Sequence, residues 1–229
     1  MIALQDVSVD LGRTAVLRHV TLHLEPGTTT AVVGPNGGGK STLLGVISGR
    51  VRQSAGSVRV GGDVADVLQS TTVDPQLRLL VEDVVRMGRY PSLGLLGRHR
   101  SADREQVRAA LDRVGLLGLR RRPFGELSGG QRQRVLIAQG LAQGAPILLL
   151  DEPSSALDAR SRCAIVEILD EEAAAGRTIV FSTHHRDEAE AADSVVAVAV
   201  ECLCCATPDE AFARPTVAAL LPDHASPVR

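Results

Sequence analysis

The sequence predicts an α/β fold in which an antiparallel β subdomain comes first and a helical subdomain is inserted into the α/β core. Three observations support this prediction. Apolar and polar residues alternate within residues 2–33, helical spacing replaces that pattern between about 70 and 128, and strands then alternate with helices. We therefore expect one domain over residues 1–229, with 1–69 and about 129–229 in the α/β core and about 70–128 in the helical subdomain.

The composition suits a packed domain without a strongly charged surface. Of the 229 residues, 44% are hydrophobic and only 2% aromatic, so the core is expected to be aliphatic. The formal net charge of −2 gives no electrostatic reason to expect nucleic acid as a partner. The apolar runs are too short to span a bilayer, so a membrane role requires a separate subunit. The four cysteines, in a chain where we read no signal peptide, indicate free thiols in a reducing cytosol.

The N-terminal part predicts strands followed by a loop and a helix. Residues 7–11 alternate between apolar and polar, as expected for a strand with one face in water. The β-branched run 28–33 leads into a glycine-rich turn, and the apolar spacing after Ser41 predicts a helix that stops at Gly49. Residues 56–60 predict another short strand.

The region between about 70 and 128 has the spacing of short helices. Val81, Val84 and Val85 recur at three- and four-residue intervals and would form one apolar face. Ser101 is expected to cap a helix that runs to about Val114. These helices would form the inserted subdomain.

The second half predicts buried parallel strands separated by helices. Residues 147–150 form a continuous apolar run that ends in carboxylates, which is typical of a central strand buried on both faces. Residues 163–172 predict an amphipathic helix, and residues 178–181 predict a second buried strand.

A phosphate-binding loop is predicted at residues 34–41, which fit the pattern G-x-x-x-x-G-K-[ST] between a predicted strand and a predicted helix. Glycines let consecutive backbone N–H groups converge on the β- and γ-phosphates, and the following helix adds the positive end of its dipole. Lys40 would contact the phosphate oxygens, and the Ser41 hydroxyl would ligate Mg²⁺. The candidate nucleotide-binding residues of this loop are Gly34, Asn36, Gly37, Gly38, Gly39, Lys40, Ser41 and Thr42.

Lys40 is also the only lysine among the 25 Lys and Arg residues. Because Arg takes every other such position, the surviving lysine indicates a role that needs a compact ammonium on a flexible stem. On composition alone, chance survival of one lysine explains the same observation.

Two carboxylates and a histidine follow the buried strands of the second half. Asp151 and Glu152 end the run 147–150, where Asp151 could orient Mg²⁺ and Glu152 could act as general base toward the attacking water. His184 follows the next predicted strand, so it would lie at the same sheet edge, within reach of the γ-phosphate. We expect the adjacent His185 to be solvated.

The segment Leu127-Ser128-Gly129-Gly130-Gln131 resembles the signature motif of ABC ATPases. From the residues alone, a serine and two glycines that open a helix form a second anion-binding helix N-terminus. The resemblance implies a P-loop NTPase core of the ABC ATPase type and a head-to-tail homodimer. In such a dimer each ATP lies between the phosphate loop of one subunit and the signature motif of the other. Ser128, Gly129, Gly130 and Gln131 thus join the candidate nucleotide-binding residues, with ATP and Mg²⁺ as the expected cofactors.

Further segments extend the resemblance over nearly the whole chain. Residues 155–158 resemble the D-loop, which in this family lies at the dimer interface, and His184 resembles the switch histidine. Gln69 matches the Q-loop glutamine that ligates Mg²⁺ and senses the transmembrane partner, with Gln76 as the rival position.

Residues 67–74 and 81–90 are similar to segments of the ATPases of manganese, zinc and iron-chelate importers. The resemblance implies an ATP-binding and ATP-hydrolysing subunit that energises a separate membrane permease for import of a metal ion or metal chelate. The expected partners are the ABC transmembrane permease, an external substrate-binding protein and a second ATPase subunit, on the cytoplasmic face of the cell membrane. Two alternatives are a soluble ABC ATPase acting as a mechanical or assembly factor, and a regulatory nucleotide-binding module. The second alternative would not need intact Glu152 and His184.

Three positions depart from the family pattern. Leu11 stands where these ATPases usually stack adenine on an aromatic residue, so base binding is expected to be weaker by about 1 kcal/mol. Residues 138–141 replace a usual Ala-Arg-Ala-Leu, and residues 200–205 replace a usual glycine turn. None of these positions is expected to touch the phosphates.

Two clusters are interpreted without a specific function. Cys202 and Cys204 are expected on one face of a strand and Cys205 on the other, as buried or idle thiols, with metal binding as the alternative. The three arginines at 120–122 are expected to form a solvated patch, with contact to a partner subunit as the alternative.

Overall fold

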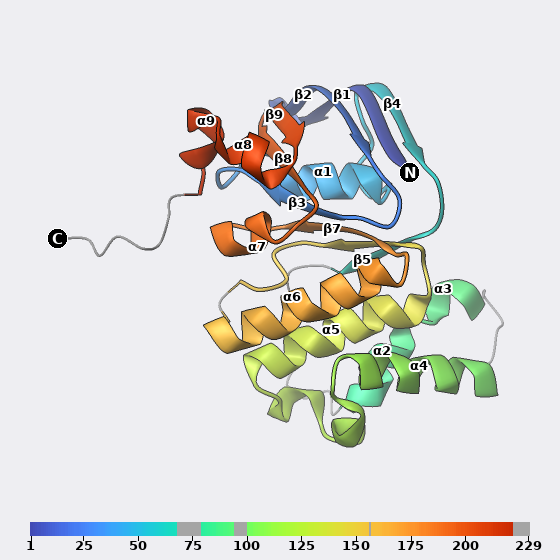
Figure 1. The fold of residues 1–229 in the computed structure, drawn as a ribbon. Coiled ribbons are helices and arrows are strands. Elements are labelled where there is room, and N and C mark those ends of the chain that lie inside the picture. Colours follow the sequence, from blue (N-terminus) through green and yellow to red (C-terminus); the bar gives the residue numbers. More distant parts are fainter. Residues whose placement is uncertain (68–78, 94–99, 156, 222–229) are drawn as a thin grey trace.

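The computed structural model describes residues 1–67, 79–93, 100–155 and 157–221. Two sheets and a set of helices are stacked in layers (Figure 1). A three-stranded antiparallel sheet lies at the top of the view, a six-stranded sheet crosses the middle, and most of the helices lie below it. This arrangement confirms the predicted α/β fold with an N-terminal antiparallel part and a helical region.

The antiparallel sheet is built around the first strand. β1 (Ile2–Leu11) lies between β2 (Thr14–Leu24) and β4 (Ala55–Val60) and pairs antiparallel with both. Val7 and Val9 are fully buried, as predicted, but the alternation is not kept over residues 7–11, since Ser8 is also buried and Leu11 is exposed. Register shifts in the pairing of β1 with β2 interrupt the period of two. This sheet therefore has one face against the core.

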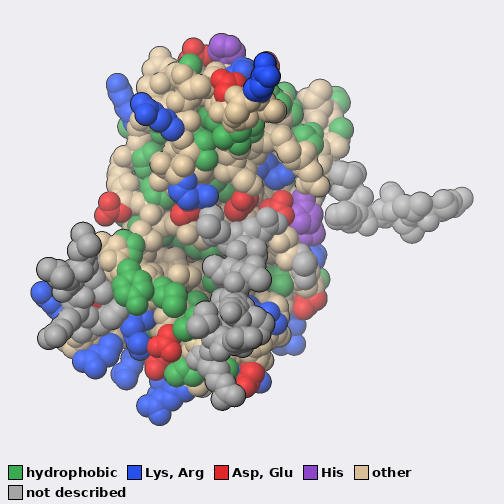
Figure 2. Space-filling model, turned by 180° about the vertical axis from the view of Figure 1, so that it is seen from behind, with side chains coloured by type: hydrophobic (Ala, Val, Ile, Leu, Met, Phe, Trp, Pro, Cys, Tyr) green, Lys and Arg blue, Asp and Glu red, His purple; other side chains and the backbone are tan. Residues whose placement is uncertain are grey.

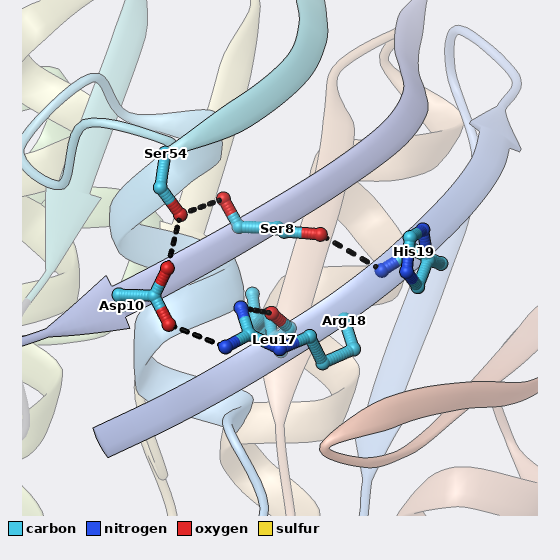
Figure 3. Close-up of polar contacts among 6 residues, drawn as sticks. All are labelled: Ser8, Asp10, Leu17, Arg18, His19 and Ser54. Carbon is cyan, nitrogen blue, oxygen red and sulfur yellow. Dashed lines mark hydrogen bonds and ion pairs between the residues drawn. The ribbon is translucent and has the colours of Figure 1, made fainter. Parts of the chain in front are cut away.

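Polar contacts tie the three strands together near the end of β1 (Figure 3). The Arg18 guanidinium on β2 donates to the Asp10 carboxylate at 2.5 Å. The Ser54 hydroxyl lies 2.9 Å from that carboxylate and 3.0 Å from the Ser8 carbonyl. The hydrogen bond from Arg18 lowers the pKa of Asp10. These contacts hold the segment that ends at Leu11.

The six-stranded sheet carries the strand order β5-β6-β7-β3-β8-β9. The first five strands in this spatial order, β5, β6, β7, β3 and β8, run parallel, and β9 is antiparallel to β8. Every residue of β3, β6 and β7 is buried, as predicted for β6 and β7. β3, which was expected among the N-terminal strands, lies in the parallel sheet instead. β5 was not predicted, because its four residues form neither a continuous apolar run nor a long alternating pattern. The bounds are β3 (Thr29–Val33), β5 (Val64–Val67), β6 (Ile147–Leu150), β7 (Thr178–Ser182), β8 (Ser194–Ala199) and β9 (Glu201–Ala206).

Each face of this sheet has its own core. Val33 and Leu148 belong to the cluster formed with α5 (Gly129–Gln143) and α6 (Ala159–Ala174). The alternate residues, such as Val32, face the cluster formed with the antiparallel sheet and with α1 (Lys40–Ile47). Helices α1 and α5 therefore lie on opposite faces of one sheet. Shorter helices near the C-terminus are α7 (Arg186–Glu190), α8 (Pro208–Phe212) and α9 (Pro215–Ala218).

The inserted region is helical in its described part. It contains α2 (Val81–Met87), α3 (Tyr90–Leu93) and α4 (Ser101–Arg113). The three valines of α2 are buried, as their spacing predicts. The prediction that Ser101 caps α4 was wrong, since Ser101 is its first helical residue. The carboxylate of Asp103 instead accepts the backbone N–H of Arg100 at 2.8 Å, so the acidic residue of the first turn provides the cap.

A buried carboxylate links the inserted helices to the core. Glu172 on α6 accepts from Arg113 of α4 at 2.9 Å and pairs with Arg177, just before β7, at 3.1 Å. Glu172 is buried, and the two guanidinium groups on it offset the cost of that burial. The contact fixes α4 against α6.

The arginines at 120–122 lie at the surface of the helical part. Arg121 and Arg122 are exposed, and Arg122 pairs with Glu126 at 3.5 Å. Figure 2 shows basic side chains gathered over this lower, helical part of the molecule. The prediction of a solvated patch is confirmed for these two residues.

The prediction for the cysteine faces was wrong. A register shift in the β8–β9 pairing places Cys202 opposite Val198 and Cys204 opposite Ala197, with one extra residue between them. Cys204 therefore joins the core on the α5 side, and Cys202 packs against the core on the α1 side. All four cysteines are free thiols, and burial raises the pKa of Cys202 to about 11. Within the described residues, no group of three His, Cys, Asp or Glu side chains could hold a metal ion.

Val200 occupies the turn between β8 and β9 in a left-handed conformation, with φ of 68°. A β-branched residue in this region is strained, so Val200→Gly is expected to raise the free energy of unfolding by about 1 kcal/mol. Urea unfolding of both proteins measures the difference. Val58→Gly, inside β4, is the control and should lower stability. A Val200→Gly protein that is no more stable than the parent would show that the turn carries no such strain.

Candidate functional site

The candidate site residues of the α/β core meet at one edge of the six-stranded sheet. Strands β6, β7 and β3 are neighbours and parallel, so their C-terminal ends lie side by side. Asp151 and Glu152 follow β6, His184 follows β7, and the loop 34–39 follows β3. Three predicted features are thus brought to one edge, although the loop lies more than 100 residues before the other two in the sequence.

The phosphate loop ends at helix α1 in the predicted way. Gly39 occupies the N-cap position with φ of 102°, and a Cβ there would lie 2.6 Å from Cδ2 of Leu17. Only glycine fits both the conformation and the space. The Gly38 carbonyl accepts the backbone N–H of Val200 at 3.0 Å, so the β8–β9 turn supports the loop.

Lys40 is held inside this loop. Its side chain is buried, with the residue 7% exposed, and its ammonium donates to the Gly34 carbonyl at 2.9 Å and the Pro35 carbonyl at 3.2 Å. A charged group enclosed by the loop's own carbonyls is positioned for an anion seated on the same loop. Ser41 follows in the first turn of α1 and is exposed.

A serine that was missed in the sequence orients both carboxylate residues. The buried Ser182 hydroxyl donates to Oδ1 of Asp151 at 2.6 Å and accepts the backbone N–H of Glu152 at 2.8 Å. Glu152 adopts φ of 47°, a left-handed conformation that is uncommon outside glycine and frequent at functional sites. The one available signal was a hydroxyl residue at the end of a predicted apolar strand.

The two histidines have different surroundings. His184 is exposed at the sheet edge, as its predicted role requires. The expectation that His185 is solvated was wrong, because its side chain is half-buried and burial lowers its pKa. Its backbone N–H donates to the Thr183 hydroxyl at 3.0 Å, which shapes the turn that carries His184.

The signature segment forms the N-terminus of α5. The Ser128 hydroxyl accepts the backbone N–H of Gln131 at 3.3 Å, and the Gln131 side chain accepts the backbone N–H of Ser128 at 3.1 Å. This capping box is a local structural reason for a serine at position 128 and a glutamine at position 131. It also leaves the Ser128 hydroxyl proton available for another acceptor. Helices α5 and α1 lie on opposite faces of the sheet. The signature segment therefore does not lie beside the phosphate loop of the same chain.

Other predicted positions are exposed or fall outside the described residues. Leu11 ends β1 and is 53% exposed, which leaves its side chain accessible to a base. Gln69 and Gln76 lie outside the described residues, so the choice between them stays a prediction. In the segment 155–158, Asp158 caps α6 by accepting the backbone N–H of Ser161 at 2.9 Å.

In the part of the chain described, we find no helix with the length and apolar character needed to cross a membrane. The family model described as ABC transporter matches residues 17–155. The manganese transport system ATP-binding protein MntA of Synechocystis sp. is 41% identical over 194 residues, which are 80% of this chain and 75% of that protein.

Two solved structures add to these similarities. An inward-facing ABC transporter assigned to the metal-chelate type superposes with a TM-score of 0.89 at 30% identity, covering 96% of this chain and 87% of that one. A dimeric bacterial ABC transporter cassette gives a TM-score of 0.78 at 25% identity, covering 91% and 99%. With the phosphate loop, the strand-end carboxylates and the signature helix in their places, we conclude that the chain belongs to the ABC transporter family as an ATP-binding, ATP-hydrolysing subunit.

Proposed function

We propose that two copies of this chain bind MgATP head to tail and hydrolyse it at the sheet edge that carries Lys40, Asp151, Glu152 and His184. The observation that carries the proposal is the convergence of three strand ends, which brings a buried ammonium, two carboxylates and an imidazole to one place. ATP would lie with its phosphates on the loop 34–41.

The phosphate-binding groups act through charge and backbone direction. The N-terminus of α1 and the loop N–H groups offer hydrogen bonds to the β- and γ-phosphates. Lys40 would exchange its carbonyl contacts for phosphate oxygens, since an anion is the stronger partner of an ammonium. Asn36, Gly37 and Thr42 complete the proposed contact set.

The oxygen groups at this edge fit Mg²⁺. Ser41 presents a hydroxyl at the start of α1, and the Ser182 bond holds one oxygen of the Asp151 carboxylate and so fixes the direction of the other. Hydroxyl and carboxylate oxygens are the ligands that Mg²⁺ prefers. We propose Ser41, Asp151 and Gln69 as its holders, and when bound the ion would neutralise charge on the phosphates.

Hydrolysis needs a base and a group that stabilises the charge on the γ-phosphate. Glu152 would accept a proton from water as the water oxygen attacks the γ-phosphorus, and the bond to the bridging oxygen of ADP breaks. His184 would contact the γ-phosphate. The left-handed conformation of Glu152, held through Ser182, sets the direction in which this base points.

Ser182→Ala is expected to lower kcat by about tenfold and to raise the Mg²⁺ concentration needed for half-maximal rate, because Asp151 loses its orienting bond. Hydrolysis rates measured across a Mg²⁺ titration test this. Ser194→Ala is the matched control, since Ser194 bonds Thr30 at the opposite edge of the sheet. Equal Mg²⁺ dependence in the parent and Ser182→Ala would remove Ser182 from the site.

The second half of each site would come from the other subunit. Ser128, Gly129, Gly130 and Gln131 open α5 on the opposite face of the sheet, so they reach ATP only across a dimer interface. The similarity to a dimeric ABC cassette supports this arrangement.

Leu11→Tyr is expected to tighten ATP binding by about 1 kcal/mol, because an aromatic ring at this exposed position can stack on adenine. Equilibrium titration with ATP measures the change. Leu203→Tyr, at another exposed leucine, is the control. Unchanged affinity for ATP in Leu11→Tyr would place the base elsewhere.

We propose further that the subunit energises import of a metal ion or metal chelate through a separate permease on the cytoplasmic face of the membrane, with an external substrate-binding protein. Similarity to a manganese transport ATPase and to a metal-chelate type transporter supports this. Tagged protein purified from detergent-solubilised cells should co-purify with a membrane permease. Deletion of the gene for this ATPase subunit should reduce the uptake of radioactive Mn²⁺ by the cells. Recovery with soluble proteins only would favour a mechanical or assembly factor.

A further inference from the structure

A charge pair between a partly buried arginine and a buried glutamate, not used by the proposed chemistry, joins α6 to α7. Arg162 lies on α6, and Glu188 on α7 is only 3% exposed. Nε of Arg162 is 3.9 Å from Oε1 of Glu188. Both atoms are buried and neither makes a hydrogen bond within the described part of the chain. The pair is therefore close enough for strong attraction but outside hydrogen-bond distance.

Glu188 holds the turn that carries His184. Its other carboxylate oxygen accepts the hydroxyl of Thr183. That hydroxyl in turn accepts the backbone N–H of His185, and the Thr183 backbone N–H donates to the Val32 carbonyl at 3.1 Å. A displacement of the Glu188 carboxylate therefore changes the conformation of the turn between Thr183 and His185.

Arg162 also contacts the segment before α6, which lies on the side of the signature loop, residues 127–131 at the start of α5. Its Nη1 donates to the Leu157 carbonyl at 3.1 Å, and its Nη2 lies 4.0 Å from the Asp187 carboxylate. Leu157 is next to the signature segment, because a Cβ at Gly129 would lie 3.7 Å from Cδ2 of Leu157. The segment that Arg162 contacts therefore lies beside the start of α5.

A second contact makes this link tight. A Cβ at Gly130 would lie only 2.7 Å from the hydroxyl oxygen of Ser161, the residue before Arg162. The starts of α5 and α6 are thus packed at the closest distance that glycine permits. Because the two helix starts are packed this closely, a displacement of the signature loop would displace the start of α6 as well.

We propose that Arg162 and Glu188 are positioning residues that couple the signature loop to the turn carrying His184. Shortening of their 3.9 Å separation to hydrogen-bond length would pull on Thr183 and reorient His184. The inference rests on the proposed function, because it requires that the signature loop binds nucleotide and that His184 contacts the γ-phosphate.

The test is a double-mutant cycle on the full chain with Arg162→Gln, Glu188→Gln and both together. The readouts are kcat for MgATP hydrolysis per titrated ATP-binding site and the Kd for ATP. Each single variant should lower kcat by about tenfold while Kd stays within about twofold. The double variant should be no slower than the slower single variant, because both changes break one link.

Arg113→Gln is the matched control, because Arg113 also pairs with a buried carboxylate, Glu172, but contacts neither loop. Its kcat should stay within about twofold of the parent. Additive losses in the cycle, an equal loss in Arg113→Gln, or wild-type kcat in both single variants would each overturn the inference.

His184→Ala separates this inference from the proposed function. If His184→Ala hydrolyses ATP at the parental rate, the role of His184 fails and the inference fails with it. If His184→Ala is impaired while Arg162→Gln and Glu188→Gln are not, the coupling alone is contradicted.

Discussion

Glu152→Gln is expected to lower ATP hydrolysis by at least about a hundredfold while leaving ATP binding intact. The amide keeps the shape of the side chain and the backbone bond to Ser182, but it cannot accept a proton from water. The phosphate-binding groups, including Lys40, are untouched. Phosphate release under saturating MgATP measures the hydrolysis rate, and equilibrium titration with ATP measures the affinity.

The control for this prediction is Glu105→Gln, which removes an exposed carboxylate on α4. It should hydrolyse ATP at the parental rate. A parental rate in Glu152→Gln would mean that another group activates the water, and the assignment of the base would be withdrawn.

Lys40→Arg is expected to lower hydrolysis by about a hundredfold, although the charge is kept. The ammonium sits in a narrow cradle between the carbonyls of Gly34 and Pro35. A planar guanidinium is wider and presents its donors in a fixed fork, so it cannot take the same place without moving the loop. Rates of MgATP hydrolysis measure the effect.

Lys40→Arg has a useful comparison in Arg50→Lys, a change at the surface ion pair with Asp66. That exchange should have little effect on the rate. Near-normal turnover in Lys40→Arg would show that hydrolysis does not require a lysine at this position, and that the only lysine of the chain is there by chance.

The elements that the sequence predicted are those with a long or continuous pattern. The buried run 147–150 and the loop 34–41 could be placed because apolar continuity and glycine spacing follow directly from burial and backbone geometry. The strand Val64–Val67 was missed, although it is as long as the predicted β6, since pairing with β6, and not its own pattern, makes it a strand. Local pattern does not report which partner a segment will meet.

Single side chains were harder to place than elements. The cysteine faces were predicted from strict alternation, which a bulge between Cys202 and Cys204 reverses. The role of Ser182 could not be predicted, because it depends on two backbone segments 30 residues apart meeting at a sheet edge. His185 is half-buried at the N-cap position of α7, where its backbone N–H donates to the Thr183 hydroxyl. Each of these outcomes depends on tertiary contacts.

The central claim is that ATP is bound between the phosphate loop of one chain and the signature loop of another. Gly129→Asp tests the signature side, because a side chain fits beside Leu157 and an acidic residue favours the first turn of α5, yet its charge repels phosphate.

The most direct measurement is the solution mass of the Glu152→Gln protein by light scattering, with and without ATP. The expected mass is twice the 24.1 kDa chain mass with ATP, the single-chain mass without ATP, and the single-chain mass with ATP when Gly129→Asp is added. A single-chain mass for Glu152→Gln with ATP, or a dimer that forms without ATP or despite Gly129→Asp, would contradict it.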